Sequence, residues 1–288
     1  MKLEGKTCLV TGGTNGIGKA SAMQLANMGA EVVILGRNAE KGSATVQEIL
    51  KHSEHDKVSF LQCNLASQAD IRRAAQEYLD TGKPLDILLN NAGIINLERQ
   101  ESEDGFEETW AVNHLGYFLL TNLLLDRIKE SNNARIINVS SGAYQFVKGI
   151  QWDDIQFERT PYKGFPVYGQ SKLANILFTK ELARQLEGTS VITHVLHPGG
   201  VRTGLGQNNQ GFFLKLIGKM VMFFLKSSDN GAKTSVHLCS SEEVGKYNGE
   251  YWANCKIKKL RPYASDREAA KRLWDLSLKQ TGLSNTSK

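Results

Sequence analysis

A tyrosine and a lysine at helical spacing are the residues in this chain best suited to proton transfer. Tyr168 and Lys172 lie four residues apart, in a stretch whose apolar spacing predicts a helix. At this spacing the phenol and the ammonium lie on one face of the helix. A phenol titrates at about 10, and a neighbouring positive charge lowers its pKa toward working pH. The pair could therefore exchange a proton with a substrate oxygen.

The same spacing occurs a second time, at Tyr144 and Lys148. With eight tyrosines, about one such match is expected by chance in every one or two chains, so the pattern alone proves little. Gly142 and Gly149 interrupt that stretch, and it has no sustained helical spacing. The sequence therefore favours Tyr168 over Tyr144. A tyrosine and lysine packed in the core without a catalytic role remain the alternative.

A glycine-rich turn, TGGTNGIG at residues 11–18, follows the first apolar run and precedes a helical pattern. There an open parallel sheet presents backbone N–H groups and the positive end of a helix to a pyrophosphate. The spacing is GxxxGxG, and a glycine-rich turn alone is a weak signal, but the strand-turn-helix context predicts dinucleotide binding rather than a merely tight turn. The expected contacts are Gly12, Thr14, Asn15, Gly16, Ile17 and Gly18.

The end of the second apolar run predicts which dinucleotide is bound. Residues 31–36 are followed by Arg37 and Asn38, with no carboxylate to accept a hydrogen bond from a ribose 2′-hydroxyl. The guanidinium of Arg37 can instead bind a 2′-phosphate through its fork of donors. The alternative is an ordinary surface arginine in a loop. We therefore predict NADP(H) in preference to NAD(H).

Apolar runs of strand length alternate with amphipathic stretches along the whole chain. The expected helices include residues of about 16–28, 109–128 and 167–186, and the strand-like runs are 7–12, 31–36, 58–63, 85–90, 134–141 and 190–198. This alternation is typical of βαβ units. No composition break marks a second domain. Residues 1–288 are predicted to form a single α/β domain, a doubly wound parallel sheet (Rossmann fold) with helices on both faces.

Composition and charge exclude several other classes of protein. The 35 Lys and Arg against 30 Asp and Glu give a mild net charge of +5, spread along the chain, so nucleic acid is not the expected partner. The densest basic run is interpreted as a solvated edge rather than an anion or membrane patch, and consists of Lys256, Lys258, Lys259 and Arg261.

The cysteines and the N-terminal residues indicate the compartment. The 4 cysteines are far apart, with no CxxC pair or nearby histidine group, so we expect neither a disulfide nor a metal site. The chain runs directly into a strand pattern, which leaves no room for a signal peptide, and no apolar run approaches the roughly 18 residues of a membrane span. We expect a cytoplasmic protein.

Several motifs occur in a fixed order: TGGTNGIG at 11–18, NNAG at 90–93, VNHLG around Asn113, VSS at 139–141, YGQSK at 168–172 and HPGGVRT at 197–203. With these motifs the chain resembles the short-chain dehydrogenase/reductase family, and within it the retinol-dehydrogenase-like branch, from Lys6 to about Leu283. The resemblance implies that Tyr168 is the general acid in reduction and the base in oxidation. It implies that Ser141 positions the substrate oxygen.

The resemblance also implies roles in cofactor binding. Lys172 would hydrogen-bond the nicotinamide ribose and Asn113 would anchor a water that connects Lys172 to solvent. Further contacts, besides Tyr168 itself, are Asn64, Leu65, Asn91, Ala92, Gly93, Pro198, Gly199, Val201 and Thr203, the last fixing the nicotinamide carboxamide. Asn64 stands where the family usually has an aspartate, and Asn15 where many NADP-using relatives have a basic residue, so Arg37 would act with less help.

The expected substrate is lipophilic. Hydride transfer needs a dry pocket, and the irregular segments 142–166 and 204–228, both apolar and aromatic, are long enough to form its walls. In 211–226 the apolar residues recur at helical spacing opposite three lysines. This segment is a surface helix packed on the core, a substrate lid or a peripheral membrane contact.

Two functions are compatible with these features. The first is an oxidoreductase that acts on a lipophilic alcohol or carbonyl, such as a retinoid, a steroid-like molecule or an aromatic aldehyde or ketone. The second is a sensor or scaffold that binds the dinucleotide without turnover, which would not need Ser141, Tyr168 and Lys172. The resemblance also leaves open a homo-oligomer formed through the apolar helix Leu115–Leu125 and the helix after Tyr168, although either helix could equally belong to the core.

Overall fold

A single sheet organises the described part of the chain, which in the computed structural model comprises residues 2–199 and 228–284. The strand order is β3-β2-β1-β4-β5-β6-β7-β8. Strands β1 to β7 pair in parallel and β8 pairs antiparallel with β7. The strands are β1 (Thr7–Thr11), β2 (Glu31–Gly36), β3 (Val58–Gln62), β4 (Ile87–Asn90), β5 (Arg135–Val139), β6 (Ile192–His197), β7 (Tyr251–Ala253) and β8 (Lys256–Ile257).

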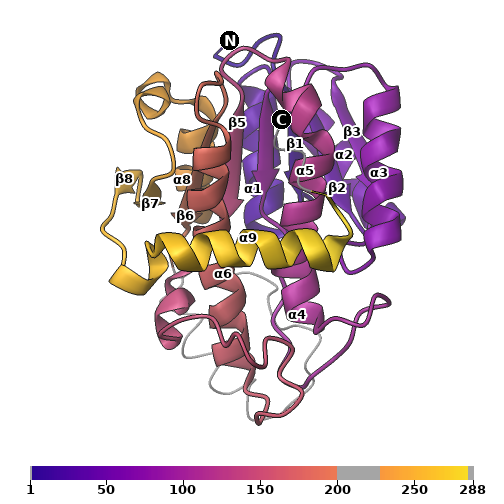
Figure 1. The fold of residues 1–288 in the computed structure, drawn as a ribbon. Coiled ribbons are helices and arrows are strands. Elements are labelled where there is room, and N and C mark those ends of the chain that lie inside the picture. The colour runs from indigo at the N-terminus through magenta and orange to yellow at the C-terminus, as the bar shows by residue number, and fades with distance from the viewer. Residues whose placement is uncertain (1, 200–227, 285–288) are drawn as a thin grey trace.

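Helices cover both faces of the sheet, as the alternating pattern predicted (Figure 1). The α-helices are α1 (Gly16–Asn27), α2 (Ala39–Leu50), α3 (Gln68–Asp80), α4 (Glu108–Trp110), α5 (Gly116–Lys129), α6 (Gly164–Gln185), α8 (Ser228–Ser240) and α9 (Arg267–Thr281). A π-helical turn, η1 (Ala111–Leu115), joins α4 to α5, and short 3₁₀ helices lie at η2 (Gly142–Phe146), η3 (Glu242–Lys246) and η4 (Pro262–Ala264).

The side chains of the central strands pack into two separate cores, because successive residues of a strand point to opposite faces of the sheet. Cys8 and Val10 of β1 pack with α1 and α8, whereas Leu9 between them packs with α3, α5, α6 and α9. All five side chains of β1 are buried. Burial on both faces explains why the central strands are continuous apolar runs in the sequence. The predicted fold class is confirmed, with β8 as the one antiparallel strand described.

The predicted helix at 109–128 is interrupted in the structure. Its first part is the short α4, its last part is α5, and the π-helical turn η1 lies between them. Such turns carry one additional residue and are frequent at functional sites. The predicted helix at 167–186 begins earlier, at Gly164. No helix within residues 2–199 and 228–284 combines the length and apolarity of a membrane span.

Helix α9 lies across α5 and α6 (Figure 1). The ring of Trp274 stacks on Phe178 of α6 at a centroid distance of 5.9 Å and meets the edge of Phe118 of α5 at 5.0 Å. His114 Nε2 lies 2.8 Å from Ser277 Oγ. These contacts bury one face of α5 and one face of α6, the two helices that the resemblance left open as a route to self-association.

Parts of the prediction lie outside the described residues. They are Val201, Thr203 and residues 204–227 of the second pocket segment, with the three alternatives for 211–226.

Candidate active site

Four predicted residues meet near the carboxyl ends of the central parallel strands, where open α/β sheets bind their ligands. Ser141 comes just after β5, Tyr168 and Lys172 lie on α6, and Asn113 lies in the π-helical turn. Helix α6 is fixed to the end of β5 by two hydrogen bonds. Ser140 Oγ donates to the Lys172 carbonyl at 2.7 Å, and Lys172 Nζ donates to the Val139 carbonyl at 3.1 Å.

Burial raises the pKa of Tyr168 to about 12, and interaction with the nearby Ser141 side chain opposes that shift. Tyr168 is therefore protonated at neutral pH, which is the state that can donate a proton to a carbonyl oxygen. We predicted a lowered pKa from the neighbouring lysine. In the structure the pKa of Tyr168 is raised instead, because the effect of burial is larger than the opposing effect of neighbouring side chains.

Lys172 has lost most of its contact with water. Its side chain is 2% exposed, and burial lowers its pKa to about 7. Nζ lies 5.5 Å from the ring centroid of Tyr168 and 5.6 Å from that of Tyr117. With a pKa of about 7, about half of the Lys172 side chains in a population are neutral at pH 7. Lys172 therefore favours the phenolate of Tyr168 less than a permanent charge would.

Asn113 ties the segment after β4 to helix α6. Its Oδ1 accepts from the Ile94 amide at 2.8 Å, and its Nδ2 donates to the Ile94 carbonyl at 2.9 Å and to Ser171 Oγ at 3.0 Å. A Cβ on Gly93 would lie 3.3 Å from Lys172 Nζ and 3.5 Å from Asn113 Oδ1. A side chain at position 93 would therefore crowd both groups.

The glycine-rich turn has no room for side chains where it meets the segment after β4. Gly12 has a φ of +66°, and a Cβ there would lie 2.8 Å from Ala92 Cα. A Cβ on Gly18 would overlap the Gly12 carbonyl and Asn91 Nδ2. Thr11 Oγ1 accepts from the amides of Asn91 and Ala92 at 2.8 and 3.0 Å. The turn and residues 90–93 thus form one unit.

This turn leads directly into α1. The Asn15 side chain caps that helix by accepting from the Gly16 amide at 2.8 Å, and Gly16 has a φ of +53°. A bare backbone at a helix N-terminus is the environment that a pyrophosphate requires. The residues present here therefore fit a dinucleotide.

Arg37 stands at the expected end of β2. It is exposed, its carbonyl accepts from Gln62 Nε2 at 3.1 Å, and its guanidinium has no salt bridge to any described residue. Thr14 lies beside Gly36, because a Cβ on that glycine would be 3.1 Å from Thr14 Cγ2. The guanidinium is thus available next to the glycine-rich turn.

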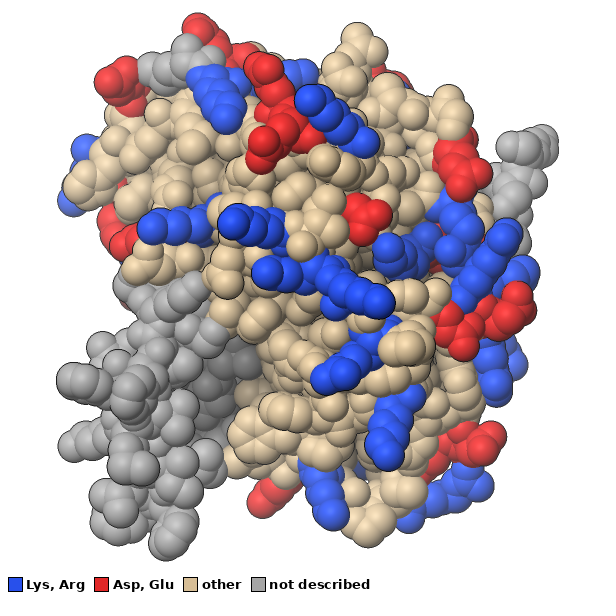
Figure 2. Space-filling model, turned by 90° about the vertical axis from the view of Figure 1, so that its left-hand side faces the viewer, with Lys and Arg blue, Asp and Glu red and all other residues tan. Residues whose placement is uncertain are grey.

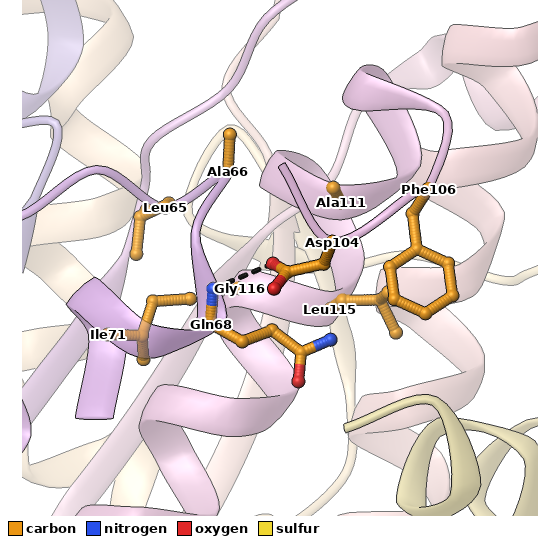
Figure 3. A pocket seen from close by; sticks show the side chains of 9 residues that line it. All are labelled: Leu65, Ala66, Gln68, Ile71, Asp104, Phe106, Ala111, Leu115 and Gly116. Carbon is orange, nitrogen blue, oxygen red and sulfur yellow. Dashed lines mark hydrogen bonds between the residues drawn. The ribbon is translucent and has the colours of Figure 1, made fainter. Parts of the chain in front are cut away.

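Asn64 and Leu65 follow β3, and their side chains are already engaged. Asn64 Oδ1 accepts from the Ala66 amide at 3.1 Å. The Leu65 side chain is 7% exposed and lines a narrow hollow with Ile71 and Leu115 (Figure 3). Any contact between Leu65 and a cofactor would therefore involve its backbone.

Sequence reasoning assigned no role to His197, although it lies in the HPGGVRT motif. Its Nδ1 accepts from the Gly142 amide at 3.0 Å and from the Gly199 amide at 3.3 Å. Gly199 has a φ of +91°, so the chain turns sharply after Pro198. His197 therefore fixes the end of β6 to the residue that follows Ser141. Its position within the HPGGVRT motif was the feature of the sequence that could have indicated this role.

Tyr144, the competing tyrosine, packs against Tyr251 and Tyr263. It lies in the 3₁₀ helix η2, is 2% exposed and packs at 5.7 Å from Tyr251 and 6.3 Å from Tyr263, between ring centroids. Lys148 is exposed. The structure thus brings Asn113, Ser141, Tyr168 and Lys172 into one site and leaves Tyr144 outside it.

Comparison with known proteins assigns the family. The chain matches the short chain dehydrogenase family over residues 6–153 and 156–211. It is 41% identical to human (Homo sapiens) retinol dehydrogenase 14 and 40% identical to human retinol dehydrogenase 13, covering 98% of this chain in both cases and 88% and 86% of those proteins. It is also 41% identical to retinol dehydrogenase 12 of Bos taurus, covering 98% of this chain and 88% of that protein. The chain belongs to the short-chain dehydrogenase/reductase family.

Solved structures give the same result for the fold. An uncharacterised protein from Mycobacterium paratuberculosis superposes with a TM-score of 0.77 at 29% identity, covering 98% of this chain and 95% of that one. A short chain dehydrogenase from Burkholderia cenocepacia J2315 in complex with NADP gives 0.68 at 27% identity, covering 87% and 96%. The fold and family define an oxidoreductase with retinol dehydrogenases among its relatives.

Proposed function

We propose that this chain is an NADP(H)-dependent oxidoreductase that interconverts a lipophilic alcohol and its carbonyl: a retinoid, a steroid-like molecule or an aromatic aldehyde or ketone. The observation that carries the proposal is the placement of Lys172 Nζ 5.5 Å from the Tyr168 ring centroid and 3.1 Å from the Val139 carbonyl, two residues before Ser141. The names of the retinol dehydrogenase relatives and the NADP complex of a structural neighbour support the class of substrate and the cofactor.

Four residues would hold and move the proton. The bound reduced nicotinamide would supply a hydride to the carbonyl carbon. Ser141 Oγ donates a hydrogen bond to the carbonyl oxygen and stabilises the negative charge that develops there. Tyr168 Oη gives its proton to that oxygen, so the alcohol forms and a tyrosinate remains. Asn113 holds the segment after β4 against α6 and so keeps the Tyr168 and Lys172 side chains in place.

Lys172 restores the proton to Tyr168. Burial places the pKa of Lys172 at about 7, so its ammonium and amine forms are both populated near neutral pH. The ammonium can protonate the tyrosinate, and the amine then recovers a proton from solvent. In alcohol oxidation the same steps run backwards, with the Tyr168 phenolate accepting the hydroxyl proton.

Substrate profiling tests the proposed reaction. We expect the purified protein to oxidise NADPH in the presence of retinal, steroid ketones or aromatic aldehydes, measured as loss of reduced-nicotinamide absorbance. If NADPH binds but no compound in this panel is turned over, the second function, a dinucleotide-binding sensor or scaffold, is favoured instead.

Replacing Arg37 with alanine is expected to weaken NADPH binding roughly 10- to 100-fold and to leave NADH binding within about twofold. The reason is that a hydrogen bond to a charged group contributes about 1.5–3 kcal/mol, and only NADPH carries the 2′-phosphate. Fluorescence titration with each cofactor measures the two constants, with Lys51→Ala as an exposed control. An equal loss for both cofactors would show that Arg37 does not bind the phosphate.

We also propose that the chain does not self-associate through α5 and α6. Helix α9 already buries Phe118 and Phe178 beneath Trp274, so a second copy would have to displace it. Cross-linking at micromolar concentration is expected to give no link between α5 or α6 of one copy and the same helices of another. A dimer in which cross-links join α5 or α6 to the same helices of a second copy would contradict the proposal.

A further inference from the structure

The imidazole of His197 joins two chain segments that border the predicted site. Its Nδ1 accepts from the Gly142 amide at 3.0 Å and from the Gly199 amide at 3.3 Å. Gly142 follows Ser141, and Gly199 is one of the predicted dinucleotide contacts. One ring nitrogen therefore links the segment that would hold the substrate oxygen to the turn that would hold the cofactor.

The His197 ring packs directly on Gly142. A Cβ on that glycine would lie 3.3 Å from Nε2 and 3.4 Å from Cε1 of the ring. The preceding residues of β5 and β6 are joined by the main chain, because the Ser140 amide donates to the Leu196 carbonyl at 2.8 Å. The His197 side chain thus extends the connection between these two strands past Ser141.

The backbone of His197 belongs to the sheet. It pairs with Ala253 of β7, and β7 in turn pairs with β8, on a face crossed by a band of Lys and Arg side chains (Figure 2). The basic run of this region is exposed, as a solvated edge requires, and consists of Lys256, Lys258, Lys259 and Arg261. The imidazole is therefore carried by a paired strand, which positions a side chain more precisely than a loop does.

Ser141 lies in the segment that this imidazole fixes. Its backbone is extended, with φ −155° and ψ 155°, and its Oγ accepts from the Ala143 amide at 3.2 Å. A hydroxyl that accepts from its own segment keeps its proton for donation to a substrate oxygen. The first two amides of η2 are thus bound by two different side chains, Gly142 by His197 and Ala143 by Ser141. Loss of the first bond would free the segment that orients the Ser141 hydroxyl.

We propose that His197 is a positioning residue for the carbonyl–alcohol reaction. It holds Ser141 Oγ at a fixed distance from the Pro198–Gly199 turn, and so aligns the substrate carbonyl with the hydride donor. This inference rests on the proposed function. An error of about 1 Å in such an alignment can lower a rate roughly 100-fold, so a group that does not touch the substrate can have a large effect.

Two substitutions separate the acceptor from the rest of the ring. In His197→Asn, Oδ1 takes the position of Nδ1 and can accept from the same amides, whereas His197→Leu has no acceptor. We expect His197→Leu to lower kcat for carbonyl reduction about 10- to 100-fold, and to leave KM for the carbonyl and the affinity for NADPH within about threefold. His197→Asn is expected to recover kcat to within about threefold of the wild type.

A double-mutant cycle tests whether His197 acts through Ser141. Ser141→Ala alone is expected to lower kcat about 10²- to 10³-fold, the usual cost of losing one donor to a developing oxyanion. Adding His197→Leu to Ser141→Ala should lower kcat by less than about threefold more, because no hydroxyl remains to be positioned.

Asn248→Leu is the matched control. Asn248 Oδ1 accepts from the Thr193 amide at 2.9 Å near the opposite end of β6, so this substitution also takes a side-chain acceptor from a strand amide. Its kcat is expected to equal that of the wild type. Circular dichroism and thermal unfolding check that each variant folds. If His197→Leu does not fold, His197→Gln replaces it, because the glutamine oxygen takes the place of Nε2 rather than Nδ1.

Several outcomes would overturn the proposal. They are wild-type kcat in His197→Leu beside an impaired Ser141→Ala, equal losses in His197→Leu and His197→Asn, or losses that multiply fully in the double variant. A fall in NADPH affinity as large as the fall in turnover would assign His197 to cofactor binding alone, which also contradicts it. If Ser141→Ala itself keeps wild-type turnover, the role proposed for Ser141 is wrong, and this inference fails with it.

Discussion

Tyr168→Phe is expected to lower carbonyl turnover by about 10²- to 10⁴-fold, the usual contribution of a positioned general acid. Phenylalanine fills the same space and removes only the phenolic hydroxyl, whose pKa the Ser141 side chain influences. The affinity for NADPH should therefore stay within about twofold. Steady-state kinetics measure the turnover, and fluorescence titration measures the binding.

Tyr247→Phe is the matched control, because it removes a hydroxyl from an exposed tyrosine. Its turnover is expected to equal that of the wild type. If Tyr168→Phe kept wild-type turnover, another group would supply the proton. If it lost NADPH binding and turnover together, the defect would lie in the architecture of the site.

Lys172→Met is expected to abolish turnover and at the same time to stabilise the cofactor-free protein. Burial holds the pKa of Lys172 at about 7, against an ordinary value of 10.5. At neutral pH the unfolded chain therefore binds more protons than the folded one at this position, and folding costs roughly 4 kcal/mol there. Methionine fills a similar volume without that cost. The Val139 carbonyl keeps a partner, since Asn175 Nδ2 donates to it at 3.3 Å.

The stability difference between the Lys172→Met variant and the wild type is expected to depend on pH. The folded-state pKa lies below the unfolded one, so the destabilisation is greatest at and below pH 7 and fades as pH rises toward 10.5. Urea unfolding should show the Lys172→Met variant more stable at pH 7, with the advantage falling to about 1 kcal/mol by pH 9.5. An advantage that does not change with pH, or a less stable variant at pH 7, would contradict a buried amine with a lowered pKa.

Local spacing made much of the fold and of the site predictable from the sequence. The apolar runs that became β1, β2, β4, β5 and β6 are continuous because both faces of each are buried, whereas the edge strand β3 is exposed at Ser59 and Gln62. Tyr168 and Lys172 lie on one face of a helix. At positions 12 and 18 only glycine fits, because a Cβ there would overlap neighbouring atoms. Each of these inferences depends on residues near one another in the chain.

The features of the fold and site that the sequence did not predict depend mostly on contacts between residues far apart in the chain. The upward shift in the pKa of Tyr168 follows from burial, which no spacing reveals. The contacts of Trp274 with Phe118 and Phe178 join segments separated by about a hundred residues or more, so the covering of α5 and α6 could not be anticipated. The π-helical turn Ala111–Leu115 interrupts a helix pattern that reads as continuous.

Transfer of deuterium tests the proposed reaction most directly. NADPH carrying deuterium at both C4 positions is incubated with the protein and the carbonyl panel, and the alcohol is analysed by mass spectrometry. We expect the wild type to form an alcohol with one deuterium on the former carbonyl carbon, and Tyr168→Phe to form far less of it. Binding of NADPH without any labelled alcohol, or an alcohol whose new C–H hydrogen comes from water, would contradict hydride transfer at this site.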